Sequence, residues 1–483
     1  MALEQFDNIS SMEEAEDYIS RITRLANRNK ELSSQLEHLV NRYSSLQKRN
    51  DTYMGLVSEL TPELGSEKAF KASQNKSFRV KMCSILYVAI DGFNNVIERP
   101  DAQKLIDELD DIHRNLDDIA IKHKMFMVKT IGDSYLYVAG IEDHSRTNPI
   151  DSILAANQMQ YYINSLYNPE IDGDEKVWKL RIGIHTGSAM AEKTGKKNSP
   201  YKIAGEAVNI ASRLGMVCEG GRINVSVMTY EMAKEFFDSE PWRAMPIKYK
   251  GLIDMFYING ITPELGGDSP TEPSELFYTK YRLIQFMDIQ EELLDYLEQN
   301  LPLNLYYHNV KHTIDVVTEV ELIGLAEGLS EEEVMLLKLA ALFHDSGHTI
   351  NYKDHEMHGV HIAHRVLKKY NFRSEQIATI DRLIMATKFP PSPTDTLEMV
   401  ICDSDLDYLG RSDFIPVSNT LYKEFHDRDM IGSFVEWNKL QLKFIRSHQY
   451  YTSTAMNLRE VNKQSQIDRL EKLINDGVEE FIE

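Results

Sequence analysis

An unbroken heptad pattern near the N-terminus constrains the fold of this chain more than any other feature of its sequence. Between Tyr18 and Leu60, mostly apolar and aromatic residues recur at alternating spacings of four and three positions. With Ile22 at position a, leucines fill most d positions, and Asn29 and Asn50 fall at a positions. Such a repeat is typical of a coiled coil, in which an asparagine at position a fixes the register and favours a parallel pair. We therefore expect a parallel homodimer; the alternative is a long amphipathic helix packed on its own domain.

The rest of the chain divides by its pattern of secondary structure. A length of 483 residues predicts two or three domains, and an apolar fraction of 42% suffices for ordinary cores. Residues 1–65 carry the heptads, and residues 78–262 alternate β-type and helical stretches. Residues 263–274 are rich in Pro, Gly, Ser and Glu, which is typical of a linker, and residues 275–483 have a helical pattern. We predict a multi-domain chain with a coiled coil, an α/β domain and an all-α domain.

Charge and composition exclude several classes of partner. A net charge of -22 repels polyanions, so nucleic acid and anionic membranes are poor candidates. The three cysteines, Cys83, Cys218 and Cys402, follow no disulfide or metal spacing, which fits a reducing compartment. The N-terminus has no basic-then-apolar signal, and no apolar run reaches the roughly 18 residues of a membrane span. We expect a cytoplasmic protein without a membrane segment.

The strongest chemical signal lies where a buried-type apolar run, LAALF, ends in the doublet His344-Asp345. Hydrophobic packing alone has no use for an ionisable pair there. Upstream, His308 and His312 stand four residues apart, so both imidazoles project from one helix face. Downstream, another apolar run is followed by Asp403, Asp405 and Asp407. Two His and two Asp from separate helices would suit a divalent metal with open water positions, unless each is a cap or part of a polar face.

The strings YHNVKH and HDSGH, followed by an aspartate, resemble the HD superfamily of metal-dependent phosphohydrolases, and in particular its cyclic nucleotide phosphodiesterase branch. The metal ligands that this resemblance implies are His312, His344, Asp345 and either Asp405 or Asp403. Asp405 is preferred because the family's aspartate is typically followed by Leu. The ion would be Mg, Mn, Zn or Fe. His308 would be the general acid that protonates the leaving oxygen, a role that its titration near neutral pH suits.

Three further features bear on this resemblance. His348 matches the second His of the family's HDxDH string, whereas Gly347 stands where that string has an Asp, which weakens the case for a second bridging metal. Gln441 and Phe444 are similar to a phosphodiesterase segment in which the amide reads the edge of a purine and the ring stacks on its face. Further ligand candidates, which also fit one polar helix face, are His355, His358, His361 and His364. The implied chemistry is attack of a metal-activated water on phosphorus.

A second resemblance covers residues 78–262. The strings KTIGDSYLYVAG, LRIGIHTG and YKIAGEAVNIASR are similar to the class III nucleotide cyclase domain. The resemblance implies an α/β, ferredoxin-like fold. It also implies that two domains pair head to tail with active sites at their interface, and the coiled coil would supply this pairing.

Several cyclase site residues follow from the same resemblance. Asp133 matches the second metal aspartate, where two Mg or Mn ions would hold a nucleoside triphosphate and activate its ribose hydroxyl. Lys129 stands where adenine-selecting cyclases have Lys. Asn209 and Arg213 match the pair that orients the ribose and stabilises the transition-state phosphate, and Lys250 resembles a lysine that contacts the terminal phosphates.

Two positions depart from the cyclase pattern. Ala89 stands where the family has its first metal aspartate, and Asp91, two residues later on the same side of a strand, is the candidate replacement. Lys202 stands where adenylyl cyclases have Asp or Thr against the adenine amino group. A lysine only donates hydrogen bonds, so it would suit a base that presents a carbonyl oxygen, and the base stays open.

Together these features predict a second-messenger enzyme that combines a class III cyclase domain with an HD domain hydrolysing a cyclic nucleotide such as cyclic AMP. In the alternative, the cyclase-like domain is a silent nucleotide sensor that regulates the HD hydrolase. A third hypothesis keeps HD hydrolysis but assigns another substrate, such as a nucleoside di- or triphosphate. The domain order suggests that one domain gates the other through the linker and the dimer.

Overall fold

The computed structural model describes residues 77–91, 102–131, 134–142, 145–167, 178–194, 201–247, 251–269 and 271–478. The predicted coiled coil in residues 1–65, and with it the predicted parallel homodimer, lies outside the described residues. Among the described residues, no helix combines the length and the apolar character needed to cross a membrane.

The first folded region is a mixed sheet of eight strands. Its strands are β1 (Ser77–Asp91), β2 (Phe126–Ile131), β3 (Ser134–Ala139), β4 (Lys179–Lys193), β5 (Tyr201–Ala204), β6 (Arg222–Ser226), β7 (Phe237–Ile247) and β8 (Gly251–Ile261). They are ordered β2-β3-β1-β4-β6-β8-β7, with β5 paired to β4. β4 and β6 run parallel, whereas β1 and β2 with β3, β5 with β4, and β6 and β7 with β8 run antiparallel. The predicted α/β alternation is therefore confirmed.

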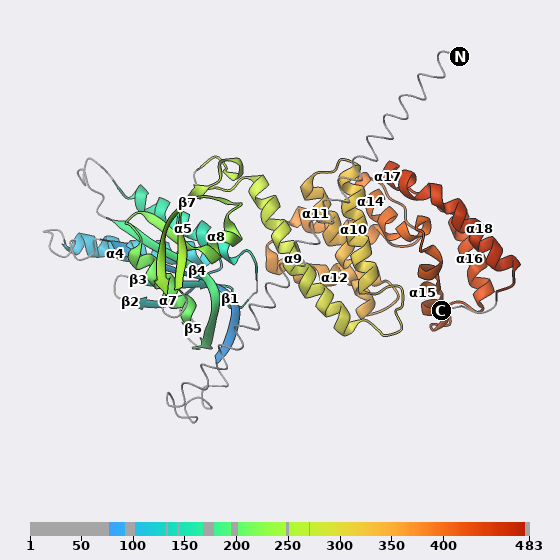
Figure 1. The fold of residues 1–483 in the computed structure, drawn as a ribbon, viewed down its shortest axis with the longest axis horizontal. Coiled ribbons are helices and arrows are strands. Elements are labelled where there is room, and N and C mark those ends of the chain that lie inside the picture. Colours follow the sequence, from blue (N-terminus) through green and yellow to red (C-terminus); the bar gives the residue numbers. More distant parts are fainter. Residues whose placement is uncertain are drawn as a thin grey trace, which may run out of the picture. The chain divides into compact units, whose positions relative to one another are not determined.

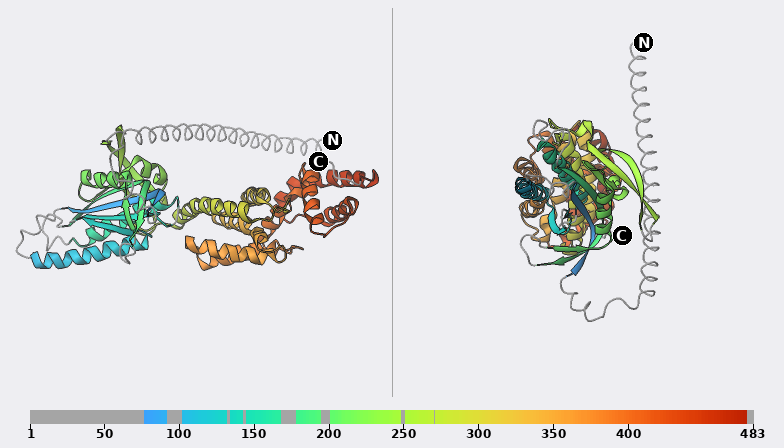
Figure 2. Two further views of the ribbon diagram at one scale, coloured as in Figure 1. Left: turned by 90° about the horizontal axis from the view of Figure 1, so that it is seen from below. Right: turned by 90° about the vertical axis from the view of Figure 1, so that its left-hand side faces the viewer.

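Helices cover both faces of this sheet because β1 alternates its side chains between two cores. Leu86, Val88 and Ile90 pack with α4 (Ala102–Lys122) and α5 (Asn148–Ser165). Tyr87 and Ala89 face the opposite side, in the core that includes residues of α7 (Glu206–Val217). Period-two alternation of this kind is expected for a strand that is buried on both faces. The left view of Figure 2 shows α4, in blue, along one side of the sheet.

The second region is helical, as predicted. Its elements in order are α9 (Glu275–Asn300), α10 (Val310–Ala326), α11 (Glu331–Phe343), η2 (Ser346–Thr349), α12 (His355–Leu367), η3 (Lys368–Tyr370), α13 (Ser374–Ala386), α14 (Thr396–Asp405), η4 (Asp407–Gly410), α15 (Phe414–His426), α16 (Phe434–Ser447), α17 (Ser453–Ala455), η5 (Met456–Glu460) and α18 (Val461–Asn475). α10, α11 and α14 pack side by side (Figure 1) around an apolar core. The short helix α8 (Val227–Ala233) belongs to the sheet region.

Candidate functional site

Three helix ends meet at one point of the helical region. His312 lies in the first turn of α10, which begins after Asn309, whose side chain accepts from the backbone N–H of Lys311 and His312. His344 caps the C-terminus of α11, whose apolar run is fully buried, and Asp345 follows it. Asp405 is the last residue of α14. The polar residues therefore gather where the helices stop.

The ligand atoms of this cluster lie at distances typical of a coordination shell. His312 Nε2 is 3.3 Å from His344 Nε2 and 3.1 Å from Asp405 Oδ1. Asp345 Oδ2 is 3.4 Å from His312 Nε2 and 3.2 Å from His344 Nε2. Bonds of about 2.0–2.1 Å to one ion separate neighbouring ligand atoms by about 3.0–3.4 Å. His312, His344 and Asp345, all predicted ligands, therefore form a group that could hold a divalent ion, and Asp405 lies against both imidazoles.

The buried carboxylates and imidazoles of this cluster strongly affect one another's pKa. Burial alone would lower the pKa of His344, but Asp345 and Asp405 outweigh it and raise this pKa well above its usual range. Burial alone would raise the pKa of Asp345, but His344 and His308 hold it well below its usual range. His344 Nδ1–H donates to the carbonyl of Ala341 at 2.7 Å, which leaves Nε2 to face the carboxylates. Two ionised carboxylates thus meet at buried imidazoles, an arrangement that binds a proton or a metal ion.

Asp403, the other candidate for the third segment, is placed differently. It is fully buried and accepts from the backbone N–H of Tyr451 at 2.9 Å and from the N–H and hydroxyl of Thr452, both at 2.7 Å. These bonds anchor the loop before α17. The geometry therefore puts Asp405, and not Asp403, against the histidines. Asp407 pairs with Arg459.

His308 lies beside the cluster and is held by a residue that the sequence analysis missed. Its Nδ1–H donates to Glu424 Oε1 at 2.5 Å. Glu424 is fully buried on α15 and also accepts from the backbone N–H of Tyr307 and from the hydroxyl of Tyr352. Burial alone would lower the pKa of His308, but Asp345 and Glu424 raise it. A signal for Glu424 was present in the sequence, because it continues the buried face of α15 that Phe414 begins.

A second group of ligand atoms lies on the other oxygen of Asp345. Oδ1 is 3.3 Å from His355 Nε2 and 3.8 Å from His348 Nε2, and the two imidazole rings stack at 3.9 Å. His348 is buried, neither of its ring nitrogens has a hydrogen-bond partner among the described residues, and burial lowers its pKa to about 2. His348 is therefore neutral and available as a ligand.

Gly347 explains how His355 reaches this group. A Cβ at Gly347 would lie 1.9 Å from the carbonyl oxygen of His355, so only glycine lets the start of α12 come this close. Gly347 replaces the second aspartate of the HDxDH pattern, and at this place the histidine His355 comes close to Asp345. Two other histidines of α12, His361 and His364, are exposed. His364 pairs with Asp381.

A cavity of about 330 Å³ adjoins the cluster. His312 and Asp405 line it, with the aromatic rings of Tyr307 and Tyr408. Two cationic side chains, Arg411 and Lys311, also line the cavity. Arg411 pairs with Asp413 at 2.6 Å and with Asp315 at 3.3 Å. The cavity therefore offers both aromatic and charged surface next to the candidate metal ligands.

The two predicted purine-binding residues lie behind this cavity, and neither lines it. Gln441 is buried on α16, and its side chain partly offsets the rise that burial causes in the pKa of Tyr408, a residue that lines the cavity. Phe444 is half-buried, and its ring centroid lies 5.8 Å from that of Phe389 and 5.9 Å from that of His448.

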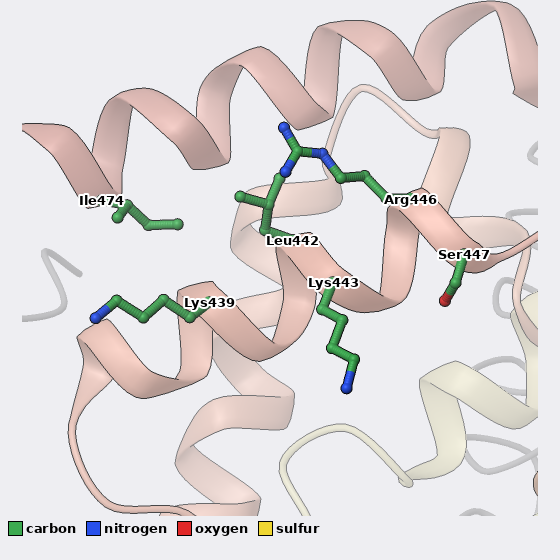
Figure 3. Close-up of a pocket in the computed structure, with 6 residues that line it drawn as sticks. All are labelled: Lys439, Leu442, Lys443, Arg446, Ser447 and Ile474. Carbon is green, nitrogen blue, oxygen red and sulfur yellow. The ribbon is translucent and has the colours of Figure 1, made fainter.

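A shallow groove of about 450 Å³ lies on another face of α16, against α18 (Figure 3). Lys439, Lys443 and Arg446 line it, and the sticks in Figure 3 show Leu442 and Ile474 between the two helices. Arg446 pairs with Glu471. None of the predicted site residues lines this groove.

The candidate residues of the sheet region are less closely assembled. Asp133 and Lys250 lie outside the described residues, and Lys129 belongs to β2. Ala89 pairs in register with Ser134, the residue after Asp133. Asp91 ends β1, where its Oδ1 lies 3.3 Å from the guanidinium of Arg181. Ala89 is thus the partner of the first residue of β3, and the carboxylate of Asp91 is engaged by Arg181.

Three further candidates lie on exposed surface. Asn209 and Arg213 are one turn apart on the outer face of α7, and Lys202 is exposed on β5. α7 lies close to the sheet because Gly215 packs on the ring of Tyr87, where a Cβ would meet the ring at 2.1 Å. The helix is thereby held with its polar face outward.

Comparison with known proteins identifies both regions. Residues 75–260 match the family model of the adenylate and guanylate cyclase catalytic domain, and residues 309–409 match the HD domain model. The sequence is 27% identical over 177 residues to soluble guanylate cyclase gcy-32 of Caenorhabditis elegans, covering 36% of this chain and 25% of that protein. It is 25% identical over 255 residues to the soluble guanylate cyclase subunit beta-2 of Homo sapiens, covering 50% and 40%. The chain thus spans a quarter to two fifths of these relatives.

Solved structures of cyclase domains are also similar. The guanylate cyclase domain of RhGC from Catenaria anguillulae, in complex with GTP, is 24% identical and matches 38% of this chain and all of that one, with a TM-score of 0.34. The adenylyl cyclase CyaB from P. aeruginosa is 23% identical over 40% of this chain, with a TM-score of 0.36. The two family matches confirm the prediction of a class III cyclase-type domain followed by an HD domain.

Proposed function

We propose that the HD domain hydrolyses the phosphodiester of a cyclic nucleotide with the help of a divalent metal, and that the cyclase domain binds a nucleoside triphosphate. The observation that carries the first half is the convergence of two imidazole nitrogens and two carboxylate oxygens at 3.1–3.4 Å, with His308 beside them. When bound, a divalent ion supplies a lowered pKa for water and positive charge near the phosphoryl oxygens.

The residues around the ion would divide the work. Those that hold it are His312, His344, Asp345 and Asp405. His348 and His355, with the second oxygen of Asp345, offer a place for another ion. Nε2 of His308 holds the proton for the leaving oxygen, because Nδ1 is occupied by Glu424. Glu424 is a positioning residue that sets the tautomer and the ring plane.

The cavity beside the cluster is proposed to hold the nucleoside. Its volume of about 330 Å³ is at the lower end of the roughly 300–1,000 Å³ typical of small-molecule sites, which suits a mononucleotide. Tyr307 and Tyr408 offer ring faces to a base, and Lys311 and Arg411 offer donors. This support favours a nucleotide over a generic phosphoester, and Gln441 would contribute through its effect on the phenol of Tyr408.

For the cyclase domain, the proposal is nucleotide binding with little or no cyclisation. Ala89 has only a methyl group where the cyclase resemblance implies a metal carboxylate, and Asp91 is engaged by Arg181. A missing carboxylate would remove stabilisation that two metal ions need. The donor-only side chain of Lys202, together with relatives named guanylate cyclases, favours a guanine nucleotide. The rival, a bifunctional cyclase and phosphodiesterase, is supported by the family match across residues 75–260.

The test is to incubate the purified full chain, supplemented with Mg²⁺ or Mn²⁺, separately with cyclic AMP, cyclic GMP, ATP and GTP and to identify the products by chromatography. Hydrolysis of a cyclic nucleotide that His344→Ala abolishes, and that His364→Ala preserves, is the expected result. His364 is the matched control because it is an exposed histidine of the same domain, outside the cluster. A cyclic product from a triphosphate with no hydrolysis of either cyclic nucleotide would instead make this chain a cyclase with a regulatory HD domain.

A further inference from the structure

One helix, α9, belongs to both hydrophobic cores. Phe277, near its start, is fully buried in the core of the cyclase sheet, in edge contact with the ring of Phe236. Ile289 and Leu293, further along, are buried in the core of the HD domain. The residues before α9 are also ordered, because Ser274 donates its N–H to the carbonyl of Leu265 and Leu265 is buried with the sheet. The predicted linker is thus a short structured segment that leads into a shared helix.

Polar contacts tie α9 to the start of α5 in the cyclase domain. Asp288 is buried and accepts from the hydroxyl of Ser145 at 3.1 Å and from the backbone N–H of Arg146 at 2.9 Å, and it pairs with the guanidinium of Arg146 at 2.5 Å. The hydroxyl of Tyr281 donates to Asp151 at 2.8 Å. We name these four residues, Arg146, Asp151, Tyr281 and Asp288, the clasp. A buried carboxylate with three donors is a specific contact that is costly to break.

On the cyclase side, the clasp lies close in sequence to the candidate nucleotide residues. The segment that ends at Arg146 follows β3, the second strand of the hairpin that carries Asp133. Glu142, in that segment, accepts from the hydroxyl of Tyr201 at 2.6 Å. Tyr201 directly precedes Lys202, the candidate contact for the base. A shift of β5 on nucleotide binding would therefore pull on the segment held by Asp288.

On the HD side, α9 touches the segment that carries His348. The hydroxyl of Tyr296 is 3.1 Å from Thr349 Oγ1, and Thr349 is the last residue of η2, which also contains His348. Arg282 donates to the carbonyls of Tyr370 and Asn371 at 2.5 and 2.8 Å. From Tyr281 to Tyr296 the helix extends about 22 Å without a break, at about 1.5 Å per residue. One rigid element therefore connects the clasp to the edge of the candidate metal site.

We propose that α9 couples nucleotide occupancy of the cyclase domain to the His348 segment of the HD site, and that the clasp is the contact through which it does so. The inference rests on the proposed function, because it needs a nucleotide in the first domain and a metal site in the second. A coupling between two such sites typically changes the equilibrium affinity at one of them by about 5-fold or more when the other is occupied.

The test is hydrogen exchange of the full chain, followed by mass spectrometry, with and without Mg²⁺ and the alpha-thio analogues of GTP and ATP. In the unmodified chain we expect protection of residues 201–213 and a change of about 5-fold or more in the exchange rate of residues 344–349. Asp288→Asn should keep the protection at residues 201–213 and lose the change at residues 344–349.

Two variants keep this test sharp. Glu292→Gln is the matched control, because Glu292 is on α9 and pairs with Lys369 within the helical region, so the response should persist. Tyr281→Phe removes the second contact of the clasp without changing charge and serves if Asp288→Asn does not fold. Protection of residues 201–213 without any change at residues 344–349, or an equal response in the clasp variants, would overturn the coupling alone. No protection at residues 201–213 with either analogue would overturn the proposed nucleotide binding, and the coupling with it.

Discussion

The HD site and the cyclase site of this chain are assembled in opposite ways. In the HD domain, three helix ends bring two carboxylates to 3.1–3.4 Å from two imidazoles in the interior of one domain. In the cyclase domain, Lys202, Asn209 and Arg213 are exposed, and Ala89 stands at the predicted position of a metal aspartate. Buried helix ends carry their polar groups into a common point, so the chain alone completes the site. Side chains on the open face of a sheet domain leave the site to be completed by a ligand or a second copy.

The largest effect is expected at the third segment of the HD site. Asp405→Asn should lower hydrolysis by more than the roughly 100-fold that loss of an outer-shell partner costs, because it removes the negative charge of a proposed metal ligand. Asp403→Asn should instead lower the free energy of unfolding by about 1–3 kcal/mol and spare the activity of the folded molecules, since Asp403 accepts three hydrogen bonds from the loop before α17. Metal content and denaturant unfolding of both variants are the measurements. Metal loss in Asp403→Asn alone would reverse the assignment.

The contrast between the two sites would be wrong if the cyclase site already had both metal carboxylates. Ala89→Asp restores a carboxylate at the position where the cyclase resemblance implies one, and we expect cyclisation of GTP or ATP to rise by about 100-fold or more. Product formation with Mn²⁺ is the measurement. Ala207→Ser, on α7 in the same core, controls for a polar group on that face. Cyclisation that is present before the change and unaltered by it would support Asp91 as the ligand.

A smaller effect is expected from Glu424, which acts through His308. Glu424→Gln should lower kcat by about 10–100-fold, because the amide keeps the shape but loses the charge that orients the imidazole. Glu424 raises the pKa of His308, so its removal lowers that pKa. As the pH rises, activity that requires protonated His308 would then begin to decline at a lower pH than in the unmodified chain. The pH profile of kcat is the measurement, with Asp427→Asn as the control at the exposed end of the same helix. An unmoved alkaline limb would argue against His308 as the acid.

The smallest effect is expected from Gln441, which does not itself line the cavity. Gln441→Ala removes a buried amide that acts on the phenol of Tyr408, so we expect KM for a cyclic purine nucleotide to rise by about 10-fold and hydrolysis of a generic phosphodiester to be nearly unchanged. Tyr408→Phe should reproduce this pattern if the amide acts through the tyrosine. Equal losses on both substrates would show that Gln441 supports only the packing of α16.

Much of the HD cluster was predictable from spacing. His308 and His312 are four residues apart, and the doublet His344-Asp345 follows a run that packing alone would leave apolar. The prediction that both imidazoles project from one helix face was wrong, because α10 begins at Val310 and His308 lies in the bend before it. The choice between Asp405 and Asp403 was not predictable from spacing. Residues two apart on a helix point in nearly opposite directions, so one of them faces the histidines while the other faces the loop before α17, and only packing decides which.

The sequence by itself determined the order of the domains, the alternation that builds the sheet, and the histidines and aspartates of the HD cluster, because these depend on local periodicity and on strings of adjacent residues. The tertiary structure alone decided that Glu424 holds His308, that His355 reaches Asp345 past Gly347, and that α9 joins two cores. Glu424 lies more than a hundred residues from His308 in the chain. Contacts of that kind depend on how helices pack against one another, which no local pattern encodes.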